Sequence, residues 1–342
     1  MKKSKWIEGL DCDATARAGV AFVLRAKLER MCALRDAALD FSDIEGVHKM
    51  RVASRRLRSA LRDFQPYLAE KVSSKRLKAV ARALGAVRDE DVAIEMVEKL
   101  IAEADEEARE GIARIAGGRR ARREEARAAL TAAVSDAALG ELRETFNAQL
   151  DEAAAETAAN GGRRRPGRTT RFSHVGGDIV RARFEELRES GRSLYEPFEV
   201  EPLHEMRIRA KRLRYAIELF TQCWGESVEP YASEIAKLQE HLGELHDCDV
   251  WAADLGARLA KGGGAKKARR RQTTADAERR AAVWLMSHFA RERAEHYGKA
   301  LALWDSWEVM GFGSSLMASV REARSRPQPP PAPEAEPAAK AD

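Results

Sequence analysis

The sequence predicts an all-α protein made of two copies of one helical unit. Aromatic residues make up only 6% of the 342 residues and alanine is abundant, a composition that favours helices over sheets. Apolar residues also recur at helical spacing along most of the chain. Finally, the arginine-rich segment "HKMRVASRRLRSALRDF", which starts at residue 48, has a near-copy from residue 204, "HEMRIRAKRLRYAIELF".

A second pair of motifs repeats with almost the same offset. His48 and His204 are 156 residues apart, and Asp89 of "LGAVRDEDV" and Asp247 of "LGELHDCDV" are 158 residues apart. Two separate motifs that recur with a nearly constant lag indicate a duplicated unit. We therefore expect two four-helix-bundle-like repeats with approximate two-fold symmetry and long peripheral helices.

Composition shifts divide the chain near its midpoint. The segment "NGGRRRPGRTTRFSH" has the glycine, proline and polar content of a linker. We therefore expect an N-terminal half over residues 1–160, a basic linker over 161–174 and a C-terminal half over 175–320. Residues 325–342 are rich in proline and are predicted to be disordered.

Helical periodicity and breaking residues place the elements of the first half. A first helical run covers 13–40, the first arginine-rich helix follows and is closed by Pro66, and a third helix covers 70–84. "GAVRDEDV" is predicted to turn into a fourth helix, with Asp89 and Asp91 as N-terminal caps. Long exposed Ala/Glu/Arg helices are expected to follow, with a break at 117–118.

The second half is expected to repeat this order. A helix over 178–190 precedes the second arginine-rich helix, and a further helix covers 228–242. "GELHDCDV" is then predicted to turn into another helix. The basic segment "KGGGAKKARRRQ" leads into a long helix that ends near Trp304.

Both arginine-rich helices separate charge from apolar surface. At about 100° per residue, one basic stripe falls within roughly 80° and consists of His48, Arg51, Arg55, Arg58 and Arg62. The second helix has the matching stripe His204, Arg207, Lys211 and Arg214, while Arg56 and Arg212 lie off the centres. The faces predicted to be buried are Met50, Ala53, Leu57, Ala60, Leu61 and Phe64 in the first helix, and Met206, Leu213, Ala216, Ile217 and Phe220 in the second.

The first stripe lacks acidic partners on its own helix. Residues 48–62 contain six Lys/Arg and no Asp/Glu, so no carboxylate stands four residues from an arginine. Compensation must come from Asp89, Asp91, Asp247 and Asp249 on neighbouring helices, or from an external anion. Arginine binds phosphate oxygens bidentately and histidine adds a hydrogen bond, which favours a long external polyanion. Four further residues would widen such a groove: Lys75, Lys78, Arg82 and Lys237.

Nucleic acid fits the stripes less well than phosphate without bases. Apart from Tyr215, the stripes have no interleaved aromatic residue on which bases would stack, and no DNA-binding motif is present. Specific nucleic-acid binding is therefore not expected.

At these residues the sequence resembles the CHAD family, the conserved histidine α-helical domain. The two arginine-rich segments carry the likeness, together with "LGAVRDEDV" and "LGELHDCDV". The resemblance implies paired four-helix bundles whose basic surfaces bind inorganic polyphosphate, and association with polyphosphate or polyhydroxyalkanoate storage granules. The binding residues it implies are His48, Arg51, Arg55 and Arg58 in the first half and His204, Arg207, Lys211 and Arg214 in the second. The Glu-x-Glu-x-Lys strand of the hydrolase domain found in some relatives is absent, which favours a stand-alone binding protein that is not an enzyme.

Two other functions remain open. His246 and Asp247, with His204, His241 and Asp249, suggest a metal-dependent phosphohydrolase, but the repeat places Arg88 opposite His246 and arginine is not an ordinary ligand. We expect neither metal nor cofactor. Alternatively, the helical faces belong to a structural protein of a granule surface, for which polyphosphate is incidental.

The cysteines and the N-terminal residues indicate an intracellular protein. Cys12, Cys32, Cys223 and Cys248 are scattered without a C-x-x-C spacing, which suits thiols in a reducing cytoplasm. Acidic residues interrupt the N-terminal segment before its short apolar run, so neither a signal peptide nor a membrane span is expected.

Overall fold

A computed structural model describes residues 6–155, 170–261 and 269–325, and within these ranges the chain is helical and contains no β-strand. The predicted all-α class is confirmed. The helices before residue 155 are α1 (Ala16–Cys32), α2 (Arg35–Leu39), α3 (Ile44–Phe64), α4 (Lys75–Glu103), α5 (Glu106–Ala133) and α6 (Asp136–Ala154). Those after residue 170 are α7 (Phe172–Glu189), α8 (Val200–Trp224), α9 (Glu229–Lys261), α10 (Arg269–Val309) and α11 (Phe312–Ser325).

The order of the long helices repeats along the chain. Helices α1, α3, α4 and α5 are matched in order by α7, α8, α9 and α10. The starts of α1 and α7 also pair, because the Ala16 amide donates to the Thr170 carbonyl at 2.8 Å and the Phe172 amide to the Ala14 carbonyl at 2.9 Å. This order agrees with a duplicated unit, while the approximate two-fold symmetry stays a prediction.

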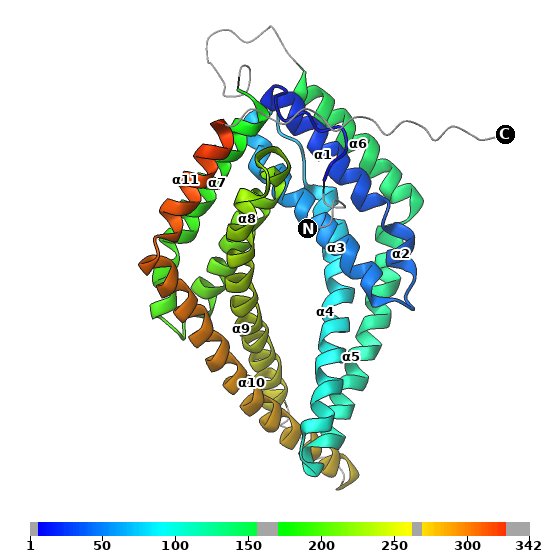
Figure 1. Cartoon of the computed structure of the whole chain (residues 1–342). Coiled ribbons are helices and arrows are strands. Elements are labelled where there is room, and N and C mark those ends of the chain that lie inside the picture. Colours follow the sequence, from blue (N-terminus) through cyan, green and yellow to red (C-terminus); the bar gives the residue numbers. More distant parts are fainter. Residues whose placement is uncertain (1–5, 156–169, 262–268, 326–342) are drawn as a thin grey trace, which may run out of the picture.

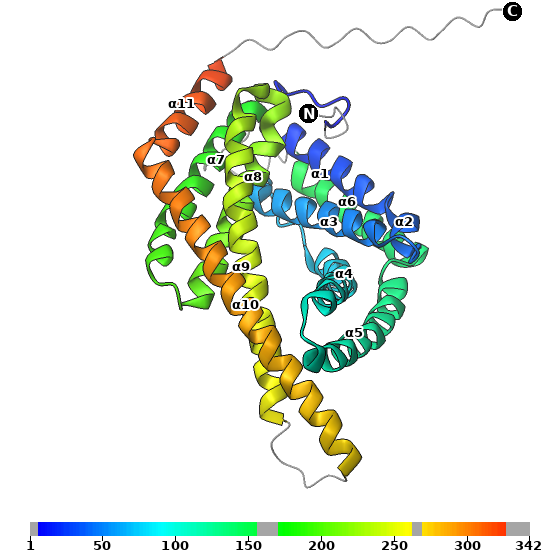
Figure 2. The ribbon, with the colours of Figure 1, turned by 60° about the horizontal axis from the view of Figure 1, so that its bottom comes forward.

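Two long arms give the molecule its shape. In Figure 1, α4 with α5 and α9 with α10 run downward from the upper helices and meet at the lower end. The α5–α10 contact closes this end, and Gly111 of α5 permits it, since a Cβ there would lie 2.3 Å from the Ala277 carbonyl oxygen. Figure 2 shows that α3 crosses the upper ends of the arms beside α8.

The two arginine-rich helices form as the sequence predicts. Asp43 caps α3 by accepting a hydrogen bond from the Glu45 amide at 2.9 Å, and α3 ends before Pro66, which lies in a 3₁₀ turn. The predicted apolar faces are buried in both helices, with Ala53 only half-buried. Both helices therefore pack by one side and leave the basic side available.

Three predicted helix breaks are wrong. α4 continues through Gly85 and α9 continues through "GELHDCDV", so Asp89, Asp91 and Asp247 are mid-helix residues and not caps. α5 likewise passes through 117–118 without interruption. A glycine in a helix costs only about 1 kcal/mol relative to alanine. The buried residues on both sides, such as Leu84 and Val87 in α4, outweigh that cost.

Two clusters of buried side chains hold the helices together, and each draws on both halves of the chain. The upper cluster includes Phe64, Phe172 and Phe220, whose ring centroids are 4.9 to 6.1 Å apart. The lower cluster joins α4, α5, α9 and α10 through residues such as Ile112 and Leu285. The long Ala/Glu/Arg helices therefore bury one face, contrary to the prediction that they are exposed. The predicted division into two bundles is not confirmed by this packing.

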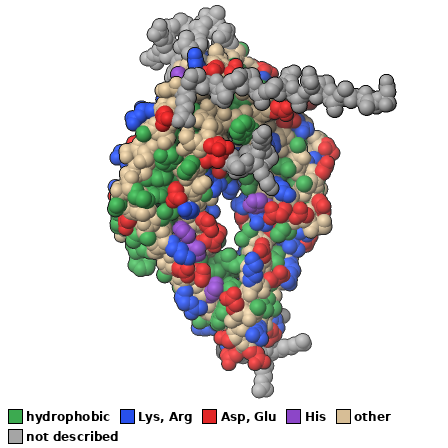
Figure 3. Space-filling model, viewed as in Figure 1, with side chains coloured by type: hydrophobic (Ala, Val, Ile, Leu, Met, Phe, Trp, Pro, Cys, Tyr) green, Lys and Arg blue, Asp and Glu red, His purple; other side chains and the backbone are tan. Residues whose placement is uncertain are grey.

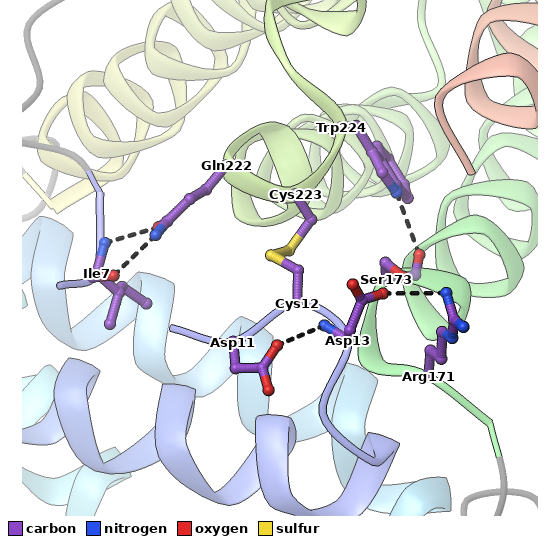
Figure 4. Close-up of a disulfide and its surroundings, with 9 residues drawn as sticks. All are labelled: Ile7, Asp11, Cys12, Asp13, Arg171, Ser173, Gln222, Cys223 and Trp224. Carbon is purple, nitrogen blue, oxygen red and sulfur yellow. Dashed lines mark hydrogen bonds and ion pairs between the residues drawn. A yellow bond between two sulfur atoms is a disulfide. The ribbon is translucent and has the colours of Figure 1, made fainter. Parts of the chain in front are cut away.

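A disulfide corrects the prediction of free thiols. Cys12, which precedes α1, is bonded to Cys223 of α8, and the close-up in Figure 4 shows this link between the N-terminal segment and α8. The two cysteines are 211 residues apart, so sequence spacing gave no sign of the bond. Cys32 and Cys248 are buried thiols.

The other sequence predictions meet the structure in part. Residues 172–174 of the predicted linker begin α7, while 161–169 lie outside the described residues, as do 326–342 of the predicted tail. In the described ranges, no helix combines the length and the apolar character that a membrane span needs.

Candidate anion-binding site

The two basic stripes lie against each other because α3 and α8 are in contact. Tyr215 of α8 is the shared point. The guanidinium carbon of Arg55 from α3 lies 5.4 Å from the centre of the Tyr215 ring, and that of Arg214 from α8 lies 5.2 Å from it. Cation–π attraction to one buried ring offsets part of the repulsion between the two arginines. The stripes, 156 residues apart in sequence, thus form one surface.

Lys211 lies at the centre of this surface. Burial, and after it the charges of Arg207, Arg55, Arg51 and Arg212, together lower its pKa to about 7. Two of these arginines belong to α3 and two to α8, so the lysine feels cations from both repeats. Burial is the largest cause of this shift, and the arginine charges that add to it show that cations of both helices are close to Lys211.

A histidine ends each stripe beside a second basic residue. His204 and His246 have their Nδ1 atoms 3.0 Å apart, and burial, the neighbouring His204 and nearby cations lower the pKa of His246 to about 4. At the other stripe, burial and then the charge of Arg88 lower the pKa of His48. The positions that match in the repeat, Arg88 and His246, therefore occupy matching places in the structure.

Carboxylates on neighbouring helices neutralise only part of the surface. Asp89 pairs with Arg51 at 3.0 Å, as the sequence suggested. Asp91 and Asp249 instead bind arginines outside the stripes, Arg123 at 3.5 Å and Arg293 at 2.6 Å. Burial raises the pKa of Asp247.

Two glutamates of α8 neutralise Arg56 and Arg212, which lie off the centres of the stripes, and also Arg214. Glu218 lies 2.6 Å from Arg56 and 3.5 Å from Arg214, and Glu205 lies 3.7 Å from Arg212. Among the described residues, no ion pair reaches Arg55, Arg58, Arg62, Arg207 or Lys211 within 4 Å. The middle of the surface thus keeps unneutralised cations.

The first stripe continues into a basic recess at the start of α4. Arg58, Lys75, Lys78 and Arg82 line a cavity of about 720 Å³, as the sequence predicted, together with Lys71 and the hydroxyl-bearing Ser73 and Ser74. Lys71 was not among the predicted residues; it falls in the predicted helix over 70–84, but α4 begins only at Lys75, so Lys71 lies in the connection before it. Lys237 bonds to Glu234 at 2.6 Å, and no contact joins it to either stripe in the described part of the chain.

Arg62 belongs to the joined surface. Burial lowers its pKa, and the strongest charge acting on it in the same direction is that of Arg212 on α8. Figure 3 shows a central opening in the molecular surface, with Lys, Arg and His side chains as well as Asp and Glu side chains along its margins.

The candidate metal ligands do not gather into one group. His204 lies against His246, but His241 faces His296, with their Nδ1 atoms 3.4 Å apart, and Asp249 is bound to Arg293. In the residues whose placement is described, no three His, Cys, Asp or Glu side chains are arranged to hold a metal ion.

Fold and surface together define a helical protein in which two repeats share one cationic site. The family model of the CHAD domain matches residues 23–256, and the chain belongs to the CHAD family. No curated protein matches the sequence significantly.

Two solved structures are similar in fold. The crystal structure of the CHAD domain from the plant Ricinus communis has a TM-score of 0.66 and 23% identity, over 86% of this chain and 93% of that one. PptA from Streptomyces chartreusis has a TM-score of 0.54 and 15% identity, over 85% of this chain and 100% of that one.

Proposed function

We propose that this protein binds inorganic polyphosphate on the joined surface of α3 and α8, without catalysing a reaction. The observation that carries the proposal is the position of Lys211 among arginines of both repeats, with a pKa near 7. A chain of phosphates supplies the missing negative charge and accepts hydrogen bonds from the arginine forks. Membership of the CHAD family supports the same ligand.

Unpartnered nitrogens on this surface favour a ligand rich in oxygen acceptors. Arg207 Nε and Arg88 Nη1 are buried and have no hydrogen-bond partner among the described residues. Buried donors of this kind are costly when unsatisfied, and phosphate oxygens along the groove are suited to accept from them. The recess of Lys71, Lys75, Lys78 and Arg82 extends the path for a longer chain.

The test is a direct titration with polyphosphates of defined length, accompanied by competition with duplex DNA at equal phosphate concentration. Polyphosphate is expected to displace the duplex at physiological salt, because a flexible chain follows the groove while a duplex presents its charge on a wide, stiff cylinder. Stronger retention of DNA contradicts the proposal and favours a nucleic-acid ligand.

Incubation with long-chain polyphosphate and Mg²⁺ tests the absence of catalysis. No release of orthophosphate is expected from pure protein. Steady release that is lost in His246→Ala contradicts the proposal and favours the phosphohydrolase.

Polyphosphate binding would bring the protein to polyphosphate or storage granules. Granule fractions should therefore lose the protein in the Arg51/Arg55/Arg58→Ala variant of α3. Recovery with polyhydroxyalkanoate granules that survives this replacement supports the structural role instead.

A further inference from the structure

Another cavity lies between α1, α3 and α8, and it touches the first stripe at His48. It has a volume of about 630 Å³ and is bounded by α1, α3, α8 and residues 6–8. This size is within the range of small-molecule sites. A second cavity of about 550 Å³ adjoins it, since both are lined by the same six residues: Trp6, Ile7, Lys27, Arg56, Glu218 and Leu219.

Cations are in excess among the charged residues of this cavity. Three acidic side chains line it: Glu218 is bound to Arg56, Asp63 is bound to Arg183 of α7 at 3.0 Å, and Glu8 is exposed. Lys27 and Arg30 of α1 also line the cavity, and no ion pair is formed by either among the described residues. Burial lowers the pKa of Lys27 to about 8, and the charges of Arg56 and Arg30 act in the same direction.

Apolar side chains also line the cavity. They are Leu34, which precedes α2, Val52 and Ala53 of α3, Leu219 of α8, and Ile7. Trp6 adds an aromatic ring to the lining, and 48% of this residue is exposed to solvent. A cavity lined by both cations and apolar side chains fits a small anion that carries an apolar or aromatic body.

The N-terminal segment is fixed over this cavity. The Ile7 amide donates to Gln222 Oε1 at 2.8 Å, and Gln222 Nε2 donates to the Ile7 carbonyl at 2.8 Å. Figure 4 shows this pair of bonds close to the disulfide between Cys12 and Cys223. The cover is therefore held in place before any ligand binds, which lowers the entropy cost of binding.

We propose that this cavity binds a small phosphate monoester with an apolar or aromatic body, such as a nucleoside monophosphate. The phosphate lies at Lys27 and Arg30, and the body lies against Val52, Leu34 and Trp6. A phosphate monoester carries a charge of about −1.5 to −2 at neutral pH, which matches these two cations. His48 and Arg56 line both the cavity and the stripes, but the inference rests on Lys27 and Arg30, which belong to neither stripe.

Lys27 separates a ligand-binding role from a structural one. Glu218 acts on Lys27 by its charge but forms no ion pair with it among the described residues. The half-buried lysine is therefore costly to the free protein, and Lys27→Met is expected to leave the melting temperature unchanged or to raise it. The same variant is expected to lose ligand binding. If Lys27 only supported the fold, Lys27→Met would instead lower the melting temperature.

The test is calorimetric titration of the full chain with phenyl phosphate, adenosine monophosphate, inorganic phosphate and phenol. At least one of the two monoesters is expected to bind about tenfold more tightly than both inorganic phosphate and phenol. Lys27→Met should abolish that preference, and Val52→Trp should block binding by filling the cavity. Lys99→Met, which changes a surface lysine of α4 paired with Glu95, is the matched control and should leave binding unchanged.

Three results overturn the proposal. The first is inorganic phosphate binding as tightly as both monoesters, and the second is monoester binding that survives both Lys27→Met and Val52→Trp. The third is no binding of either monoester by folded protein at concentrations up to about 5 mM, which corresponds to an affinity too weak for a built site. Polyphosphate titrations run on the same variants keep the two proposals distinct, since Lys27→Met should leave polyphosphate affinity nearly unchanged.

Discussion

The basic stripes of α3 and α8 come from similar sequences but differ in how their charges are neutralised. On α3, Arg55, Arg58 and Arg62 have no ion pair among the described residues, and the carboxylate bound to Arg56 belongs to α8. On α8, Glu205 and Glu218 bind arginines of their own helix. The first stripe therefore has more cations without an ion pair. The second helix carries the glutamates that neutralise arginines of both helices.

The two repeats therefore contribute different charges to the joined surface. Residues 48–62 carry six basic and no acidic residues, a balance of +6, while residues 204–218 carry five basic and two acidic residues, a balance of +3. Lys211 of the less basic stripe still lies among cations from both helices, and its pKa is about 7. The first repeat contributes arginines, whose charge is permanent. The second contributes, besides its own arginines, Lys211, whose charge changes near neutral pH.

Removing three stripe arginines of α3, of which Arg51 is bound to Asp89, is expected to have the largest effect. Arg51/Arg55/Arg58→Ala should weaken polyphosphate binding about 100-fold and flatten the slope of log affinity against log salt by about 2, because each lost contact releases one counterion fewer. Arg207/Lys211/Arg214→Ala should cost less, since Glu218 already competes for Arg214. Titration at several salt concentrations measures both. Equal losses, with helicity unchanged, contradict the unequal contribution of the two stripes.

Breaking the disulfide is expected to destabilise the link between the two halves. Cys12→Ser removes a bond that closes a loop of 211 residues in the unfolded chain, and should lower the free energy of unfolding by about 2–4 kcal/mol. Thermal melts with and without reductant measure the effect. The variant itself should no longer respond to reductant, because Cys32 and Cys248 are not bonded to each other. An unchanged melting temperature in the variant means that the link contributes no stability.

The pH dependence of polyphosphate binding is expected to report on Lys211. Its pKa is about 7 in the free protein, and a bound polyanion raises it. The charged form favours binding, so its contribution is complete below pH 7 and is lost as pH rises through 7 towards the pKa of the bound state. Affinity should therefore fall by up to about tenfold from pH 6.5 to 8.5. Lys211→Arg keeps the charge and should flatten this profile; an unchanged profile contradicts the assignment.

Relieving the second stripe of a carboxylate is expected to have the smallest effect. Glu205→Gln frees Arg209 and Arg212 from partial neutralisation and should raise polyphosphate affinity about two- to threefold, as expected for an exposed ion pair. The gain should shrink at high salt. Glu185→Gln, which breaks a similar exposed pair with Arg188 on α7, is the matched control. A loss of affinity in Glu205→Gln shows that this glutamate positions the arginines.

The structure corrects the sequence most where polar residues interrupt a helical pattern. "GAVRDEDV" and "GELHDCDV" contain glycine and aspartates that favour a turn, but α4 and α9 run through them. Their apolar residues, among them Val87 and Leu245, are buried and hold the helix together across the polar stretch. Local propensity is a weak guide where tertiary packing supplies larger energies. The same packing brings Asp89 to Arg51, so a residue expected to cap a helix neutralises the site.

The sequence alone determined the helical class, the repeated order of elements and the two amphipathic helices, because each depends on periodicity within a single segment. It also predicted the faces of α3 and α8 that are buried. Only the tertiary structure decided that the two stripes share Tyr215, that Cys12 bonds to Cys223, and that Lys27 lines a cavity under the N-terminal segment. These contacts join residues far apart in the chain, and sequence spacing carries no information about such distances until the helices pack.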